Sequence, residues 1–217
     1  RAAIGTDGAV RGVDTGTIVR AAMGLRVDRQ AVGTGHIKDL LAVLAECSSE
    51  PAIVIGHSFG GLVALGAAAH APERVAAVGA YEPPMPWTDW WGNLTSFTSA
   101  DTAAEEFFER MIGAEVWTSL PDQSRRLRQA EGPALMADYA AAEAGLVVDV
   151  ADLLCPLAAA HGSRTLPKFE RAAVTLAAAA HDATLTVIAG ASHGAHMSHP
   201  EAFADWITSV HASTLGA

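Results

Sequence analysis

The sequence has few cysteines and no long uninterrupted apolar run. Cys47 and Cys155 are the only cysteines among 217 residues, too few for the disulfide framework that holds small secreted domains together. We expect both to be small buried residues. Glu, His or Arg interrupts each alanine-rich stretch before it reaches the roughly 20 residues of a membrane helix. These absences argue against a disulfide scaffold and a membrane-spanning protein. The sequence also shows no secretory signal, so a cytoplasmic location is expected.

Basic clusters are scarce as well. Lysine and arginine total 14 against 24 acidic residues, a net charge of −10. The one basic cluster, Arg125–Arg128, is short and is followed by Glu131, which is typical of a solvated helix face. An acidic chain of this kind is a poor partner for nucleic acid or an anionic membrane, so we expect neither. With half of its residues hydrophobic, a chain of this length can instead bury a substantial core as one domain.

A glycine-flanked serine follows the apolar run Ala52–Ile55. The segment Gly56–Gly60 reads Gly-His-Ser-Phe-Gly, which is typical of a nucleophile elbow between a strand and a helix. There a side chain on either flank would collide with the strand or the helix, and the serine takes a strained backbone conformation. The small residues at 61–69 predict that helix, whose N-terminus favours negative charge. Ser58 is therefore the predicted nucleophile, and the backbone N–H of Phe59 is the predicted oxyanion donor.

A histidine lies where the last predicted strand leads into a helix. Residues 183–189 alternate β-forming side chains, and Gly190 opens a loop that carries His193. Beyond Pro200, apolar residues at i, i+3, i+4 and i+7 form one helix face. They are Phe203, Trp206, Ile207 and Val210. Because a loop between rigid elements can expose a catalytic base and still hold it, His193 is the predicted general base.

Together these features resemble the α/β-hydrolase superfamily, whose nucleophile precedes its histidine in the chain. The likeness also rests on the lead into the strand after the elbow helix, a Cys-Pro-Leu before a later strand, and the last loop and helix. These segments are Pro72–Val75, Cys155–Leu157 and Gly190–Phe203. The resemblance covers about residues 36–210 and is esterase- or peroxidase-like. It implies an α/β fold, with a mostly parallel sheet flanked by helices and a helical lid inserted into it.

The N-terminal 35 residues depart from that family. Relatives open with several strands and a loop that donates a second oxyanion N–H. Residues 1–35 are instead punctuated by seven glycines, which leaves room for short strands at most, such as Thr17–Arg20. We therefore expect the N-terminal strands to be missing and the chain to be a truncated or N-terminally altered hydrolase. Losing one oxyanion donor lowers the rate by about 10²–10³, so weak or absent activity is part of this expectation.

The acid of the triad is the second departure. Relatives carry an aspartate a few residues after the strand that corresponds to residues 157–162 of this chain. Here no carboxylate follows that strand before Glu170. Three candidates remain: Glu82, Asp152 and Asp182. Glu82 ends a predicted strand where some relatives, notably the haloalkane dehalogenases, place their acid, whereas the two aspartates precede strands and are expected at the wrong end. We choose Glu82; the alternative is a strand-end carboxylate that hydrogen-bonds the turn of the next two prolines.

Residues 83–150 break the alternation of strands and helices. We assign them to a lid, and residues 1–82 and 151–217 to the hydrolase core. Thr102–Glu105 has the spacing of a capping box and predicts the start of a lid helix. Four of the five tryptophans lie in the lid: Trp87, Trp90, Trp91 and Trp117. They indicate either an aromatic-walled apolar pocket over the serine or side chains that hold the lid on the core.

Three histidines at a spacing of three residues, His193, His196 and His199, raise the question of a metal site. Gly194 and Pro200 make this segment a loop, and nothing nearby completes a ligand set. We therefore expect no metal, and the sequence indicates no cofactor.

The predicted function is acyl transfer to water on a small apolar ester or related carbonyl substrate, as in a carboxylesterase. Ser58 attacks the carbonyl, His193 removes its proton, and Glu82 orients the imidazole. Perhydrolysis and carbon–carbon bond hydrolysis use the same scaffold. The alternative is a catalytically impaired hydrolase-fold protein that binds a small apolar ligand or a partner, because of the two departures. The oligomeric state is left open.

Overall fold

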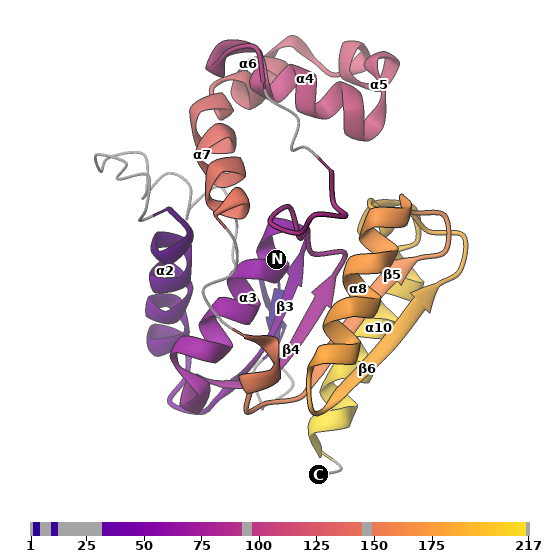
Figure 1. Cartoon of the computed structure of the whole chain (residues 1–217). Helices are drawn as coiled ribbons and strands as arrows, with labels where there is room; N and C mark the ends of the chain where they lie inside the picture. The colour runs from indigo at the N-terminus through magenta and orange to yellow at the C-terminus, as the bar shows by residue number, and fades with distance from the viewer. Residues whose placement is uncertain (1, 5–9, 13–31, 93–96, 145–148, 216–217) are drawn as a thin grey trace.

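The sheet at the centre of the structure is mostly parallel, as predicted. A computed structural model describes residues 2–4, 10–12, 32–92, 97–144 and 149–215 (Figure 1). The six described strands run in the order β2-β1-β3-β4-β5-β6, and β3 to β6 are parallel to one another. These four are Ala52–His57, Val75–Tyr81, Leu157–Gly162 and Ala183–Ile188. Their carboxyl ends meet at one edge of the sheet, where open α/β sheets bind their ligands.

The central strands are apolar because both faces of the sheet are covered. β3, β4 and β5 are buried along almost their whole length, whereas the edge strand β6 is largely exposed. A strand with two covered faces reads as a continuous apolar run rather than an alternating one. His57 and Tyr81 are register partners at the carboxyl ends of β3 and β4. The residues that follow them, Ser58 and Glu82, therefore occupy neighbouring positions at the sheet edge.

The expectation that the N-terminal strands are missing needs correction. β1 (Ala2–Ile4) and β2 (Val10–Gly12) form an antiparallel pair, and β1 also pairs antiparallel with β3. Each is three residues long, too short to show the alternation of side chains by which a strand is recognised in a sequence. The predicted strand Thr17–Arg20 lies outside the described residues.

Helices cover both faces of the sheet (Figure 1). α2 (Val32–Cys47), α3 (Phe59–His70) and α8 (Pro167–Ala179) lie on one face, and α10 (Pro200–Leu215) lies on the other. The apolar stripe predicted for α10 packs against residues of β3 and β4. This three-layer arrangement confirms the predicted α/β architecture. None of the helices in the described part of the chain has the length and apolar character to span a membrane.

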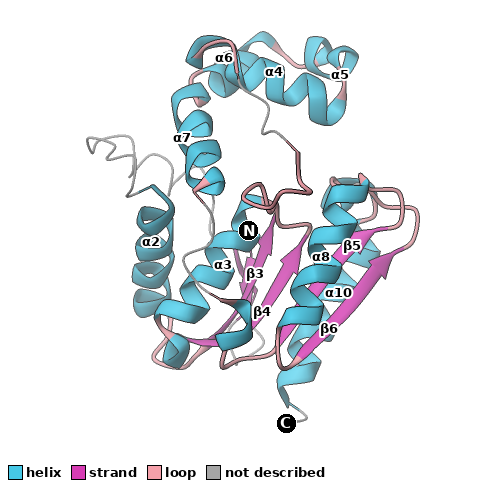
Figure 2. Ribbon diagram, in the orientation of Figure 1, coloured by secondary structure: helices cyan, strands magenta, loops and turns pink. Residues whose placement is uncertain are grey.

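Four helices between β4 and β5 form what we call the helical segment, residues 97–144. They are α4 (Ala100–Ile112), α5 (Ala114–Ser119), α6 (Asp122–Gln129) and α7 (Gly132–Glu143). Figure 2 shows α4 to α6 beyond the carboxyl ends of the strands, with α7 leading back toward α2. His36 of α2 and Asp138 of α7 form a partly buried pair, with 2.7 Å between Nε2 and Oδ1. This contact joins the helical segment to the core.

α4 begins before the predicted capping box. Its N-cap is Ser99, whose Oγ accepts a hydrogen bond from the Thr102 backbone N–H at 3.2 Å. The Thr102 hydroxyl instead donates to Glu106 Oε1, one turn further on, at 2.7 Å. The serine satisfies an amide at the helix start that would otherwise lack an acceptor, so the helix begins at Ala100 rather than after Thr102.

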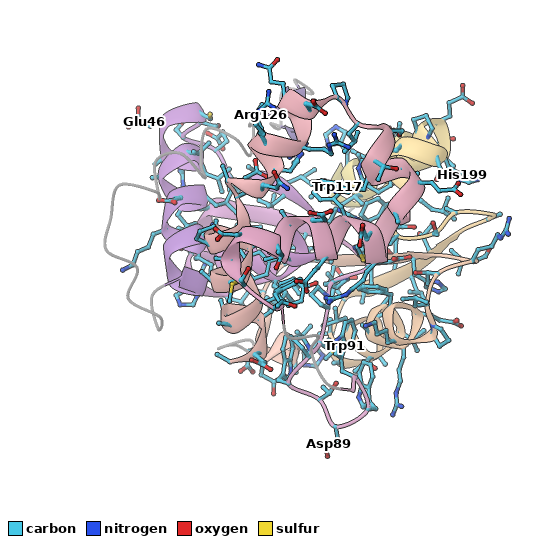
Figure 3. All side chains as sticks on the ribbon, turned by 90° about the horizontal axis from the view of Figure 1, so that it is seen from above. Glu46, Asp89, Trp91, Trp117, Arg126 and His199 are labelled. Carbon is cyan, nitrogen blue, oxygen red and sulfur yellow. The ribbon has the colours of Figure 1, made fainter. Side chains whose placement is uncertain are left out.

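The tryptophans of residues 83–150 pack against other aromatic side chains. Trp91 (Figure 3) is 6% exposed and meets the Phe169 ring edge to face, with centroids 5.2 Å apart. Trp117 is 2% exposed and stacks on Phe108 inside the helical segment at 5.5 Å. Both contacts fit the second predicted role, that of holding the segment together and on the core. The division between core and lid at residue 83 stays a prediction.

Candidate active site

The chain turns sharply at Ser58, between β3 and α3. Ser58 has φ 55° and ψ −130°, a conformation that L-residues rarely adopt. Its backbone N–H donates to the Tyr81 carbonyl at 2.9 Å, so β4 supports the turn. A β-carbon at Gly56 would come within 2.2 Å of the Gly60 carbonyl oxygen, which explains the need for glycine there. The strand, turn and helix predicted around the serine are all present.

Glu82 occupies the corresponding place at the end of β4. It has φ 47°, and among the described residues Ser58 is the one other non-glycine residue with a positive φ. Its side chain is fully buried, and its backbone N–H donates to the Ala160 carbonyl of β5 at 2.9 Å. Such conformations persist only where the surrounding structure imposes them, and they gather at functional sites. The two residues therefore mark this edge of the sheet as the candidate site.

Both oxygens of the Glu82 carboxylate are hydrogen-bonded. Oε1 accepts the Gly162 backbone N–H at 2.8 Å, and Oε2 accepts the Thr165 hydroxyl at 2.9 Å and His193 Nδ1–H at 2.7 Å. Burial raises the pKa of this carboxyl group, but the hydrogen bonds from His193, Gly162 and Thr165 outweigh burial and hold the pKa below its ordinary value. Glu82 is therefore ionised at neutral pH and paired with the imidazole.

The contact with Glu82 determines the tautomer of His193. A carboxylate can only accept, so Nδ1 carries a proton and Nε2 of the neutral ring keeps its lone pair. The Phe169 ring stacks on the imidazole, with centroids 4.3 Å apart and an angle of 24° between the planes. The His193 side chain is 16% exposed. Nε2 is thus the atom that can accept a proton from a hydroxyl group.

The structure separates the three acid candidates. Asp152 and Asp182 precede β5 and β6, at the opposite edge of the sheet from the His193 loop. Of the three, Glu82 is the one whose carboxylate meets the imidazole, and none of its hydrogen bonds goes to the proline turn that follows it. The loop after β5, where relatives carry their acid, supplies the Thr165 hydroxyl to Glu82 instead.

Ser58 and His193 are linked through the residue before the serine. His57 Nε2 lies 2.7 Å from the His193 carbonyl oxygen. No hydrogen bond joins the Ser58 hydroxyl to the His193 imidazole in the described structure. Phe59 is the first residue of α3, where backbone N–H groups have no acceptor within the helix. The N-terminal stretch in which relatives carry the second oxyanion donor lies largely outside the described residues.

Four residues of the site received no role from the sequence: His57, Tyr81, Thr165 and Phe169. His57 carries one signal, its place beside the predicted nucleophile. Nothing local points to Thr165 or Phe169, because they reach the site through the packing of β5 and α8 beside β4.

The three histidines considered for a metal have other contacts. Within the described residues, no group of three His, Cys, Asp or Glu side chains could hold a metal ion. His196 lies in α9 (Ala195–Ser198), with its ring centroid 4.9 Å from that of His57. His199 Nδ1 is hydrogen-bonded with the Ser198 hydroxyl.

Comparison with protein families agrees with this architecture. The model of the alpha/beta hydrolase family matches residues 14–206. The chain therefore belongs to the alpha/beta hydrolase family, and this membership supports a hydrolase-type function. No curated protein matches the chain significantly.

Solved structures of similar fold cover most of the chain. A lipase-esterase related protein from Clostridium acetobutylicum ATCC 824 has a TM-score of 0.64 at 13% identity and covers 86% of this chain and 77% of that one. MenH from S. aureus has a TM-score of 0.63 at 16% identity, with coverages of 88% and 79%. A hydrolase from Pseudomonas aeruginosa PA01 has a TM-score of 0.63 at 20% identity, with coverages of 83% and 71%. At these identities the likeness concerns the fold alone.

Proposed function

We propose that the protein is a serine hydrolase that transfers the acyl group of a small apolar ester, or of a related carbonyl compound, to water. The observation that carries this proposal is the 2.7 Å hydrogen bond between the buried Glu82 carboxylate and His193 Nδ1. It lies at the same sheet edge as the strained turn at Ser58. An imidazole held in this tautomer offers Nε2 as a general base.

In the proposed reaction, His193 Nε2 takes the proton of the Ser58 hydroxyl while Oγ attacks the substrate carbonyl. The Phe59 N–H at the start of α3 donates to the oxyanion. The tetrahedral intermediate expels the alcohol, which receives the proton from His193, and an acyl-serine forms. Water then gives a proton to Nε2 and attacks the acyl carbonyl. The second tetrahedral intermediate releases the carboxylic acid as His193 returns the proton to the Ser58 oxygen, which restores both the serine and the neutral imidazole. Glu82 stays ionised and stabilises the imidazolium ion.

Aromatic side chains beside the proposed base favour an apolar substrate. Phe169 stacks on His193. Phe59, next to the proposed nucleophile, meets the ring of His36 edge to face at 5.4 Å. Sites lined by such rings bind apolar groups, which favours a hydrophobic acyl or aromatic ester over a sugar or a phosphorylated compound.

A fluorophosphonate probe, which forms a covalent bond with an activated serine, tests the proposal. We expect one probe per chain, located on Ser58 by peptide mass spectrometry. Labelling should be absent in Ser58→Ala, and at least about 10³-fold slower in His193→Ala, because the base is gone. Ser119→Ala, which changes an exposed serine of α5, is the matched control and should label at the wild-type rate.

Two outcomes of the labelling experiment would contradict the proposal, and a turnover assay would then identify the reaction. Equal labelling of Ser58→Ala would reject Ser58 as the nucleophile. A folded wild-type protein that resists the probe would favour the alternative, a catalytically impaired protein that binds a small apolar ligand or a partner. If labelling succeeds, turnover of p-nitrophenyl butyrate with water or with hydrogen peroxide separates ester hydrolysis from perhydrolysis, and a β-diketone tests carbon–carbon bond hydrolysis.

A further inference from the structure

Two side chains at the carboxyl ends of β3 and β4 hold the backbone of the His193 loop. His57 Nε2 lies 2.7 Å from the carbonyl oxygen of His193, and the Tyr81 hydroxyl donates to the carbonyl oxygen of Ser192 at 2.8 Å. His57 and Tyr81 are themselves register partners in the parallel ladder. Two successive carbonyl groups of the loop are thus held by two neighbouring strands, one of which leads directly into Ser58.

The contact with the carbonyl determines the state of His57. A carbonyl oxygen can only accept, so Nε2 carries the proton and donates it. Burial, and after it the nearby His193, lower the pKa of His57 to about 3, although the hydrogen bond to the His193 backbone acts in the opposite direction. The ring is therefore neutral near pH 7. Its centroid lies 4.6 Å from that of the His193 imidazole.

We propose that His57 is a positioning residue, which sets the distance between the nucleophile and the base by donating to the His193 carbonyl group. This inference rests on the function proposed above. The donor and Ser58 are consecutive residues, so they move together with the turn. The acceptor belongs to the same residue as the imidazole. Glu82 orients the ring, and His57 places the backbone that carries it.

The position of His57 makes its contact more consequential than that of Tyr81. A misplacement of about 1 Å between reacting groups can lower a rate about 10²-fold. The Tyr81 hydroxyl holds the preceding residue, Ser192, from a strand that does not carry the nucleophile. Loss of the His57 donor should therefore slow the reaction more than loss of the Tyr81 hydroxyl.

The first experiment compares two substitutions of the same residue. His57→Phe keeps an aromatic ring and removes the donor, whereas His57→Gln retains an amide N–H that can donate from a similar position. Tyr81→Phe removes the second contact alone. His181→Phe, at an exposed histidine between α8 and β6, is the matched control. Fluorophosphonate labelling, ester turnover and the unfolding midpoint are measured for each variant.

For His57→Phe we expect kcat and the labelling rate to fall about 10- to 100-fold, with KM changed by less than about twofold. His57→Gln should recover to within about threefold of the wild type, and Tyr81→Phe should fall between the two. A purely structural role would lower the unfolding midpoint without this split between kcat and KM. A wild-type rate in His57→Phe, or equally slow Phe and Gln variants, would overturn the inference.

A second measurement does not depend on turnover. Within the loop, the Ala195 N–H donates to the Ser192 carbonyl at 3.1 Å, and the Ala191 N–H donates to the Ile188 carbonyl at 3.3 Å. Hydrogen exchange at these two amides should speed up about tenfold or more in His57→Phe and return toward the wild-type rate in the Gln variant. Amides in the middle of α10 serve as the internal control.

The two measurements separate this inference from the proposed function. A wild-type protein whose loop exchange responds to His57→Phe, but which fluorophosphonate does not label, would reject the hydrolase and support the role of His57 in holding the loop. A labelled wild type whose exchange and rates are unchanged in His57→Phe would support the hydrolase and reject the role of His57.

Discussion

Ser58 and Glu82, at the carboxyl ends of β3 and β4, have positive φ angles, whereas no described non-glycine residue of the helical segment does. Glu82 is also fully buried with three hydrogen-bond donors around it, while ion pairs of the segment, such as Arg110 with Glu106, lie on the surface. Strained backbone and buried charge both oppose folding. The strained backbone and the buried carboxylate therefore lie at one edge of the sheet. The described part of the helical segment has neither positive φ angles outside glycine nor a fully buried charge.

The contrast indicates where substitutions should matter. At the strand ends, a change should alter activity by orders of magnitude and shift stability in either direction, because strain or a buried charge is removed. In the helical segment, the same kind of change should have a small effect on both. Four experiments test this difference.

The largest effect is expected for Ser58→Gly. Activity and probe labelling should fall about 10⁴-fold or more, because the proposed nucleophile is lost. At the same time the free energy of unfolding should rise by about 1 kcal/mol, since glycine adopts a positive φ without strain and only part of this gain is offset by its flexibility in the unfolded chain. Urea unfolding measures the change. A less stable Gly variant would contradict the idea that this turn is strained.

Glu82→Gln comes next, paired with Glu106→Gln in α4. Without its charge, the side chain at position 82 no longer stabilises a protonated imidazole, and kcat should fall about 10³- to 10⁴-fold. Glu106 accepts the Thr102 hydroxyl at 2.7 Å and pairs with Arg110 within α4. Its substitution should leave kcat unchanged and lower the unfolding midpoint only slightly. Steady-state kinetics and thermal unfolding give both quantities. A similar fall in kcat in the two variants would contradict the expected difference between the strand ends and the helical segment.

The third prediction concerns pH and stability. The pKa of His57 is about 3 in the folded protein and ordinarily 6.5, so between these values the unfolded chain binds a proton that the folded chain does not. Stability from this group is complete above about pH 6.5 and is lost as the pH falls, by about 2 kcal/mol between pH 7 and pH 5. The lowered pKa of Glu82 acts in the same direction at pH values below its ordinary 4.5.

Urea titrations at several pH values measure this slope. The slope between pH 7 and pH 5 should be shallower in His57→Gln, because the proton-binding site is gone. It should stay at the wild-type value in Glu106→Gln of the helical segment. Parallel slopes for the wild type and His57→Gln would contradict a buried neutral imidazole.

The smallest effect is expected at the contact between the helical segment and the core. Asp138→Asn removes the charge that faces His36, in a pair whose side chains are 28% and 12% exposed. Asparagine keeps an oxygen that can accept from His36, so the free energy of unfolding should fall by about 0.5–1.5 kcal/mol, and kcat should change by less than about twofold. A double-mutant cycle with His36→Gln isolates the coupling free energy. A large fall in kcat would instead show that attachment of α7 shapes the site.

Local patterns were sufficient to predict the elements around Ser58 and His193. The two glycines that flank the serine, the apolar run before them and the small residues after them are close together in the chain. The strand, turn and helix that they predict are present. Local patterns gave the wrong helix start where two neighbouring residues could both cap the helix. The start of α4 is an example: both Ser99 and Thr102 can cap a helix, and the neighbouring hydrogen bonds select Ser99.

The sequence by itself determined the positions of the main strands and helices, the strained turn and the histidine loop, because each depends on residues close together in the chain. The tertiary structure decided which carboxylate meets the imidazole, since Glu82 and His193 are 111 positions apart. It also decided that Thr165 donates to that carboxylate and that His57 holds the loop. Hydrogen bonds of this kind depend on the order and register of parallel strands, which no local pattern of residues specifies.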